Sequence, residues 1–374
     1  MTRILATVRA TLLATAGIAM PLSAAAQEIT IASWVGPKNI MNAAGLEPFK
    51  EWVEGQGFET KFFTGGSLYT TKSIFSGLKD GVVDLGVISY TFFPAELSNG
   101  ALIAEVGMTN ENNAAAAAAA IEYQLLECPD CLAEFADNNI VYVAGHATST
   151  YALISLEPIR EAADLEGKTM RVAGGSWAEW ARFAGGVDIN IPGGEVFDAL
   201  SKGSIDVAVY SASSLEAFSL WDVAKYVTTA DLGAVASVGT FVYNKDFWSE
   251  LTPEQRQAFA EESLKRAIDV TIGYEEEVDR VLAEAPDHGV EVIPASDSIL
   301  EQKAAYLEAA ISQAKERARD NLKVENPNEK VDTIVRLNAK WAELLGESPT
   351  REEAYALLKS EVFDKVDFAT YGVK

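Results

Sequence analysis

Apolar and polar positions along the chain follow two periods, which indicates strands alternating with helices. From residue 29 the side chains alternate at every second position, which is typical of a half-buried strand. A helix over residues 41–54, a second strand over 58–63 and a helix over 70–79 are predicted next, followed by an apolar, β-rich strand over 82–90. This order of strand, helix and strand is typical of an α/β layer fold.

One helix–strand unit occurs twice. Residues 76–89 can be laid over residues 198–211, with Leu, Gly, Asp, Val and Ser matching at fixed offsets. In each copy the helix ends at a glycine, Gly81 or Gly203, because glycine adopts the left-handed conformation that closes a helix at little cost. The repeat predicts two similar α/β lobes, although two ordinary helix–strand units could match by chance.

Helix-capping patterns recur in the C-terminal third, which is predicted to be mostly helical. Thr252 and Gln255 have the spacing of a capping box, with proline at the first helical position between them. Thr350 and Glu353 form another, and Asp297 is placed to cap a third helix. Further strands, between and after the two repeat copies, are predicted over residues 140–144, 151–156, 168–172 and 238–243.

The first 26 residues predict export. Arg3 and Arg9 precede an apolar stretch from residue 10 to about 20, and small residues ending at Ala26 follow. That order is typical of a secretory signal peptide, so we expect cleavage near Ala26 and a periplasmic mature protein. A membrane anchor is the alternative, but the apolar stretch is shorter than the ~20 residues that span a bilayer.

Composition limits the possible partners. With 374 residues, 48% of them hydrophobic, the chain is long enough to bury the cores of two domains. The formal net charge of −25 repels the phosphates of nucleic acids and anionic lipid headgroups, so no nucleic-acid partner is expected. An anionic ligand would need a specific positive group, because the overall field opposes its approach.

The two cysteines, Cys128 and Cys131, are close enough to form a disulfide in an oxidising compartment. A thioredoxin-like redox motif is the functional alternative. That motif follows a strand, whereas here a helical pattern over residues 114–126 runs directly into Cys128, so we favour a structural clip. The cysteines together with His146 and His288 are too few for the usual zinc site, and no metal or other cofactor is expected.

No catalytic constellation is evident, because a Gly-x-Ser-x-Gly elbow and a phosphate-binding loop with lysine are both missing. The most informative residue is Arg171, which ends a short strand before a glycine-containing turn. In open α/β sheets ligands bind beyond the carboxyl ends of the strands, and an arginine there presents a planar fork that fits a carboxylate. A surface salt bridge is the ordinary alternative for an arginine.

The surroundings of Arg171 carry a family resemblance. The motif Asp-Leu-x-Gly-Lys-x-x-Arg-Val over residues 164–172 is followed by Ile-Pro-Gly-Gly-Glu over 191–195 and Gly-Ser-Ile-Asp over 203–206. In this order the motifs resemble the substrate-binding proteins of tripartite ATP-independent periplasmic (TRAP) transporters, the dicarboxylate-binding family. Further matches, spread over nearly the whole mature chain, lie at residues 33–34, 81–86, 244 and 251–254.

The resemblance implies a two-lobed α/β periplasmic binding protein with a cleft between the lobes and long C-terminal bridging helices. It implies that Arg171 pairs with the substrate carboxylate, and that the partners are a small four-helix membrane subunit and a large sodium-coupled permease. Lobe I is then expected to comprise residues 27–149 and 237–285. Lobe II is expected to comprise residues 150–236 and 286–374, including the bridging and C-terminal helices.

Two departures from the family bear on the ligand. Many members carry a second arginine in the segment that corresponds to residues 145–150, and an asparagine where this chain has Tyr210; this chain has neither. Losing the second cation argues against a compact dicarboxylate such as succinate. Asn244 is a polar candidate for the site, and the aromatic candidates, each with core packing as its alternative, are Trp34, Tyr90, Phe92, Trp177 and Tyr210.

Aromatic side chains in the cleft would favour a monocarboxylate with an apolar, aromatic or quaternary-ammonium portion, since cations sit well over aromatic faces. Three alternatives stay open at this point. An ATP-driven importer uses binding proteins with similar lobes, and a periplasmic redox enzyme could use the cysteine pair. A metal-assisted carboxylate site, with Glu195 or Asp206, is the weakest of the three.

Overall fold

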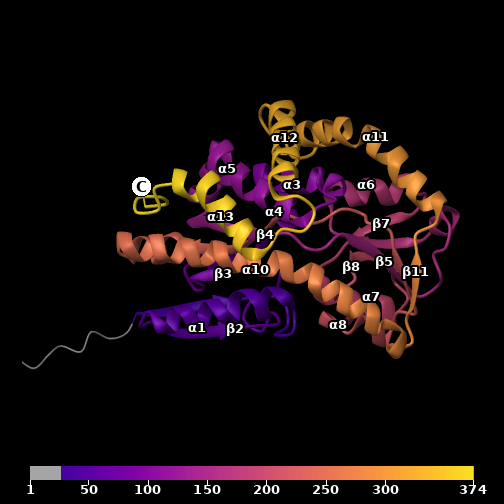
Figure 1. Cartoon of the computed structure of the whole chain (residues 1–374), viewed down its shortest axis with the longest axis horizontal. Coiled ribbons are helices and arrows are strands. Elements are labelled where there is room, and N and C mark those ends of the chain that lie inside the picture. Colours follow the sequence, from indigo (N-terminus) through magenta and orange to yellow (C-terminus); the bar gives the residue numbers. More distant parts are fainter. Residues whose placement is uncertain (1–26, 374) are drawn as a thin grey trace, which may run out of the picture.

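The computed structural model describes residues 27–373, so the expected signal peptide and its cleavage site near Ala26 lie outside the described residues. Two mixed sheets, each covered by helices, make up two lobes (Figure 1). The first sheet has the order β2-β1-β3-β10-β4, and the second has the order β11-β9-β5-β8-β6-β7. This is the two-lobed α/β arrangement that the sequence predicts. None of the helices in residues 27–373 has the length and hydropathy needed to cross a membrane.

The strands of the first sheet are β1 (Glu28–Ala32), β2 (Glu59–Phe63), β3 (Leu85–Ser89), β4 (Ile140–His146) and β10 (Val238–Asn244). Those of the second are β5 (Tyr151–Ser155), β6 (Thr169–Val172), β7 (Val187–Asn190), β8 (Val207–Ser211), β9 (Tyr226–Thr229) and β11 (Glu291–Pro294). The helices of the N-terminal half are α1 (Glu47–Gly55), α2 (Ile74–Lys79), α3 (Ser98–Glu105), α4 (Asn113–Glu122), α5 (Pro129–Asp137) and α6 (Gly175–Phe183). Those of the C-terminal half are α7 (Val196–Ser201), α8 (Ser214–Ala217), α9 (Lys245–Glu250), α10 (Pro253–Glu284), α11 (Asp297–Asp320), α12 (Pro327–Leu345) and α13 (Arg351–Glu361).

The sequence repeat forms equivalent units in the two lobes, α2 with β3 and α7 with β8. In each unit the aspartate before the strand accepts a hydrogen bond from the backbone of the neighbouring strand. Asp84 Oδ2 lies 2.7 Å from the nitrogen of Thr30, and Asp206 Oδ2 lies 2.7 Å from the nitrogen of Thr169. The matched aspartates therefore fix the same strand pairing in both lobes, which explains why the motif occurs twice.

Capping residues set the ends of the C-terminal helices. Thr252 and Thr350 form complete capping boxes, as expected from their spacing. Asp297 is not the N-cap of α11, because the helix begins at Asp297 itself and Ser296 precedes it. Its carboxylate lies in the first turn instead, where a negative charge interacts favourably with the helix dipole.

Two short segments and the helices α10 and α11 connect the lobes within the described residues. Helix α10 packs against β4 in the first lobe, and the short helix η8 (Ala285–His288) that follows it packs against β11 in the second, so that α10 crosses from one lobe to the other in Figure 1. The chain also crosses at residues 147–150 and 230–237, where Thr150 and Ala234 form an isolated antiparallel bridge.

Helices α12 and α13 lie on lobe I, although the sequence analysis placed all of residues 286–374 in lobe II. Helix α12 packs on α4, and α13 packs on α10. The buried residues of α12 recur at helical spacing, from Val331 through Ile334 and Leu337 to Trp341. They meet the alanine-rich surface of α4, whose small side chains allow the two helices to approach closely. Of the helices after residue 296, α11 is the one that contacts both lobes, packing against α6 of lobe II and α3 of lobe I.

Cys128 and Cys131 are joined by a disulfide with a Cα–Cα distance of 5.2 Å. The bond lies at the junction between the π-helical turn η4 (Tyr123–Glu127) and α5. Both sulfur-bearing residues are buried. A redox enzyme needs a thiol that is solvent-accessible, so this disulfide has the position of a clip between two helical segments.

A buried ion pair holds α11 against α3. Arg317 Nε binds Glu105 Oε2, and Arg317 Nη2 donates to the backbone oxygen of Glu105 over 3.2 Å. Both side chains are only 10% exposed. Burial raises the pKa of Glu105, while the charge of Arg317 opposes that rise. Such a pair stabilises the fold only while both side chains are present, because either one alone would be a buried, unpaired charge.

Replacing Arg317 with Met should lower the free energy of unfolding by about 3–5 kcal/mol, because Glu105 would keep its burial and lose its cation. Urea unfolding measures the loss. The exposed pair between Lys61 and Glu28 is the matched control, with side chains 56% and 45% exposed, and Lys61→Met should cost at most about 1 kcal/mol. Equal losses in the two variants would show that the buried pair does not hold α11 in place.

Candidate functional site

A cavity of about 50 Å³ lies between the lobes where strand ends converge. Its volume is several times the ~10–15 Å³ that a cavity needs to hold one water molecule. From lobe I it is lined by Trp34 after β1, Ser89 at the end of β3 and His146 at the end of β4; from lobe II by Arg171 on β6 and Ser211 at the end of β8. This is the edge of the sheets at which α/β proteins bind ligands.

Arg171 is a buried cation, only 4% exposed. Its Nε donates to the backbone oxygen of Ile191 over 3.1 Å, and its Nη1 donates to that of Val209 over 3.4 Å. The guanidinium carbon lies 4.2 Å from the centre of the Tyr210 ring. Within residues 27–373, no carboxylate lies at ion-pair distance from Arg171. Because a buried charge without a counter-ion is costly, Arg171 is the residue of this cavity at which a negative group would be stabilised most.

Tyr210 is the platform on which Arg171 rests. Its ring stacks on Phe218 at 5.6 Å and meets Tyr151 edge-on at 5.7 Å. Burial raises the pKa of Tyr210, and the charge of Arg171 opposes that rise. The loop at Gly193 closes over the ring so tightly that a Cβ there would lie 2.1 Å from the Tyr210 hydroxyl. The glycine of the Ile-Pro-Gly-Gly motif is thus required for this packing.

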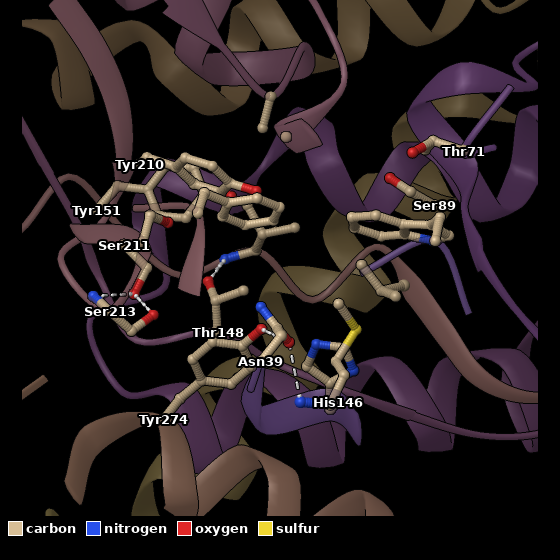
Figure 2. Close-up of a pocket in the computed structure, with 18 of the residues that line it drawn as sticks. Asn39, Thr71, Ser89, His146, Thr148, Tyr151, Tyr210, Ser211, Ser213 and Tyr274 are labelled. Atoms are coloured by element: carbon tan, nitrogen blue, oxygen red, sulfur yellow. Dashed lines mark hydrogen bonds between the residues drawn. The ribbon is translucent and has the colours of Figure 1, made fainter. Parts of the chain in front are cut away.

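Hydroxyl groups and aromatic rings make up most of the remaining wall, as Figure 2 shows. On the lobe II side, the hydroxyls of Ser211 and Ser213 are 2.8 Å apart. Tyr274 enters from the middle of α10, and its hydroxyl donates to Asn39 Oδ1 over 3.4 Å. Ligand contacts would therefore reach both lobes and the helix that joins them.

His146 contributes a neutral polar group. It is 1% exposed, its ring stacks on Tyr274 with the ring centres 5.6 Å apart, and its Nδ1 lies 2.5 Å from the Thr240 hydroxyl. Burial lowers the pKa of His146 to about 3, so the imidazole is uncharged at neutral pH. Arg171 is consequently the one charged side chain among the described residues that line the cavity.

Four of the residues expected in the site line the cavity: Arg171, Trp34, Phe92 and Tyr210. Tyr90, Trp177 and Asn244 lie elsewhere. Tyr90 is fully buried beside Gly100, while its neighbours Ser89 and Thr91 line the cavity. The strand end therefore turns Tyr90 toward the core.

Trp177 and Asn244 have packing roles that explain their positions. Trp177 donates from Nε1 to the backbone oxygen of Leu232 over 2.6 Å, and its ring lies where a side chain at Gly107 would be. It thus fastens α6 to the lobe junction. Asn244 caps α9 by accepting from the nitrogen of Phe247, and donates to the backbone oxygen of Leu78. An asparagine directly before a helix is a common N-cap, a signal that the sequence carried.

Several lining residues could not be identified from the sequence alone. Ser89 and Ser211 end the two copies of the repeat, so the repeat offered a signal for them. Tyr274 carried none, because its apolar neighbours on α10 have the pattern of ordinary core residues. Other lining residues that were not anticipated include Asn39, Thr71, Thr91, His146, Thr148, Tyr151, Ser213, Ser214 and Phe218.

The acids considered for a metal-assisted site do not line the cavity. Asp206 is engaged with the backbone of Thr169, and Glu195 lies in the short helix η6 (Gly193–Glu195). Across the part of the chain that the structure describes, no group of three or more His, Cys, Asp or Glu residues is placed to hold a metal ion.

Comparison with known families gives the class of protein. Residues 34–318 match the model of the bacterial extracellular solute-binding proteins, family 7. The chain belongs to this family. A family 7 protein binds a solute outside the cytoplasm and is not an enzyme, which confirms the family-level prediction from the sequence motifs.

Solved structures of similar fold are TRAP periplasmic solute-binding proteins. One from a marine metagenome, specific for aromatic acids and holding 3-hydroxybenzoate, is 19% identical with a TM-score of 0.75 over 85% of this chain and 99% of its own. One from Desulfovibrio salexigens with orotic acid is 19% identical, with a TM-score of 0.72 over 84% and 99%. One from Bordetella bronchiseptica with mandelate is 18% identical, with a TM-score of 0.69 over 84% and 99%. At 18–19% sequence identity, the similarity to these structures shows the fold of this chain.

Substituting Gly193 tests the packing that supports Arg171. Gly193→Ala should lower the free energy of unfolding by about 1–3 kcal/mol, because the new methyl group would overpack the Tyr210 ring. Gly194→Ala is the matched control, since a Cβ there meets no atom within 4 Å. Urea unfolding of the two variants measures the difference. Equal stability would mean that the loop moves away freely and does not clamp the ring.

Proposed function

We propose that this family 7 protein captures a small monocarboxylate in the periplasm for a TRAP transporter. The observation that carries the proposal is Arg171, a buried guanidinium that has no carboxylate partner among the described residues and lines the cavity between the lobes. Backbone oxygens and the Tyr210 ring hold its position. A planar guanidinium of this kind pairs with a carboxylate through two parallel hydrogen bonds.

One carboxylate is favoured over two. A second carboxylate would lie against lobe I, where the described lining residues supply no lysine or arginine and where His146 is neutral. Desolvating a carboxylate without a cation is costly. The aromatic walls, from Trp34 and Phe92 on one side to Tyr210 and Phe218 on the other, favour an acid with an aromatic or otherwise apolar body. The ligands of two of the similar structures, 3-hydroxybenzoate and mandelate, have this composition.

Capture would proceed by closure of the lobes. Arg171 on lobe II and Trp34 on lobe I line the same cavity, so a ligand that contacts both favours the closed state over the open one. Tyr274 adds a contact from α10, the helix that spans both lobes. The ligand thereby stabilises the arrangement of lobes that a membrane partner would recognise.

The proposed partners are a small four-helix membrane subunit and a sodium-coupled permease, reached after export and cleavage near Ala26. The fold likeness to TRAP periplasmic proteins supports this partner over an ATP-driven importer. The acidic net charge of −25 suits a protein that stays in solution between its encounters with the membrane.

Binding of 3-hydroxybenzoate, mandelate and succinate, measured by isothermal titration calorimetry, tests the proposal. We expect the two monocarboxylates to bind more tightly than succinate. Arg171→Ala should weaken monocarboxylate binding by about 30-fold or more, since losing one partner of a buried charge pair costs about 2–5 kcal/mol.

Arg160→Ala is the matched control. It removes the same charge from lobe II, but Arg160 is 52% exposed and pairs with Glu291 at the surface. The Arg160→Ala variant should bind the monocarboxylates with nearly the affinity of the unmodified protein. Tighter binding of succinate, or equal losses in the two variants, would contradict the assignment of a single carboxylate to Arg171. Glycine betaine in the same series tests the quaternary-ammonium alternative, which has no acidic side chain in the cavity to support it.

A further inference from the structure

Two polar atoms on the lobe I side of the cavity have no hydrogen-bond partner among the described residues. They are Nε2 of His146 and Nε1 of Trp34, and both atoms are buried. Both residues line the cavity that holds Arg171. His146 itself is only 1% exposed. A buried polar group left unsatisfied costs about 1–3 kcal/mol, so these two atoms mark a place where a polar group is to be received.

The chemistry of the two atoms limits what that group can be. Trp34 Nε1 is a donor only, so it requires an acceptor. His146 shares its Nδ1 with the Thr240 hydroxyl, and its Nε2 either donates or accepts, depending on the tautomer that this contact selects. A hydroxyl group suits either atom, because it accepts from an N–H and can also donate to a bare imidazole nitrogen.

Other polar groups fit less well. An ionised carboxylate would lack a cation on this side, because burial lowers the pKa of His146 to about 3 and keeps the ring uncharged. An ammonium group would lack an acid, since no described lining residue is Asp or Glu. A quaternary ammonium makes no hydrogen bond, so it would leave both nitrogens unsatisfied. A neutral hydroxyl is the remaining match.

We propose that His146, together with Trp34, selects ligands that carry a hydroxyl group at the end remote from the carboxylate, so that the substrate class is a hydroxylated monocarboxylate. This inference rests on the proposed function, in which Arg171 of lobe II binds the carboxylate. Thr240 is a positioning residue: it lies behind the imidazole, 2.5 Å from Nδ1, and orients Nε2 without lining the cavity itself.

The test compares acids with and without the hydroxyl. Titration calorimetry on the mature protein would use 3-hydroxybenzoate against benzoate, and 3-hydroxyphenylacetate against phenylacetate, because in both hydroxylated acids the hydroxyl lies on the ring, away from the carboxylate. For at least one pair, the hydroxylated acid should bind at least tenfold more tightly, since a site that hydrogen-bonds a hydroxyl rejects an analogue lacking it. His146→Phe keeps an aromatic ring to stack on Tyr274 and removes both nitrogens. It should reduce that preference to less than threefold while benzoate or phenylacetate still binds.

Trp34→Phe provides a second variant, which keeps an aromatic side chain and loses the N–H together with part of the indole ring. It should also diminish the preference, and it carries the test if His146→Phe fails to fold in a thermal unfolding measurement. Because the imidazole is neutral over this range, the preference should not change between pH 5 and pH 8. A preference that grows as the pH falls through 6 would show a charged histidine and would overturn a neutral hydroxyl contact.

The outcomes separate this inference from the function on which it rests. If none of the four acids binds, or if Arg171→Ala binds them unchanged, the proposed function fails. If the acids bind through Arg171 but each hydroxylated acid binds no more tightly than its partner, the proposed function stands and the role of His146 is wrong. An undiminished preference in both His146→Phe and Trp34→Phe would also reject it.

Discussion

A buried positive charge without a counter-ion is the constraint on which the site depends. Arg171 could not remain in so enclosed a place unless the backbone oxygens of Ile191 and Val209 and the face of Tyr210 compensated part of its desolvation. That compensation fixes much of the local structure: Tyr210 needs its stacking partners, and Gly193 must lack a side chain. The guanidinium lines the cavity, so its remaining hydrogen-bonding capacity is the basis of the proposed binding site.

The lobes contribute different chemistry to one cavity. Lobe II supplies the charge, whereas lobe I supplies uncharged donors and acceptors such as His146 and hydroxyls such as that of Ser89. In a chain whose net charge is −25, an anion is held only where this local arrangement outweighs the repulsion of the whole molecule. The proposed specificity for one anionic group, and against two, rests on that asymmetry.

Much of the fold could be predicted because its signals are local. The repeat placed an equivalent helix and strand in each lobe, and the threonines of the capping boxes set the starts of α10 and α13. The assignment of the C-terminal helices could not be made this way, because the apolar face of α12 specifies only that it must be covered, not that α4 covers it. The same contrast between local signals and long-range packing applies to the residues that line the cavity. Arg171 follows a motif, but Tyr274 and His146 reach the site through long-range packing that neither period nor spacing reveals.

The paired aspartates, Asp84 and Asp206, have an evolutionary consequence. Each lies within its own lobe and fixes its strand through one backbone hydrogen bond, so the strands that end at Ser89 and Ser211 are positioned by separate aspartates. Under the proposed function, substitutions on the lobe I side could change which neutral group is recognised while the strand pairing of lobe II around Arg171 stays intact. Proteins of this kind could then change the ligand that they recognise through single substitutions, without passing through forms that bind no ligand.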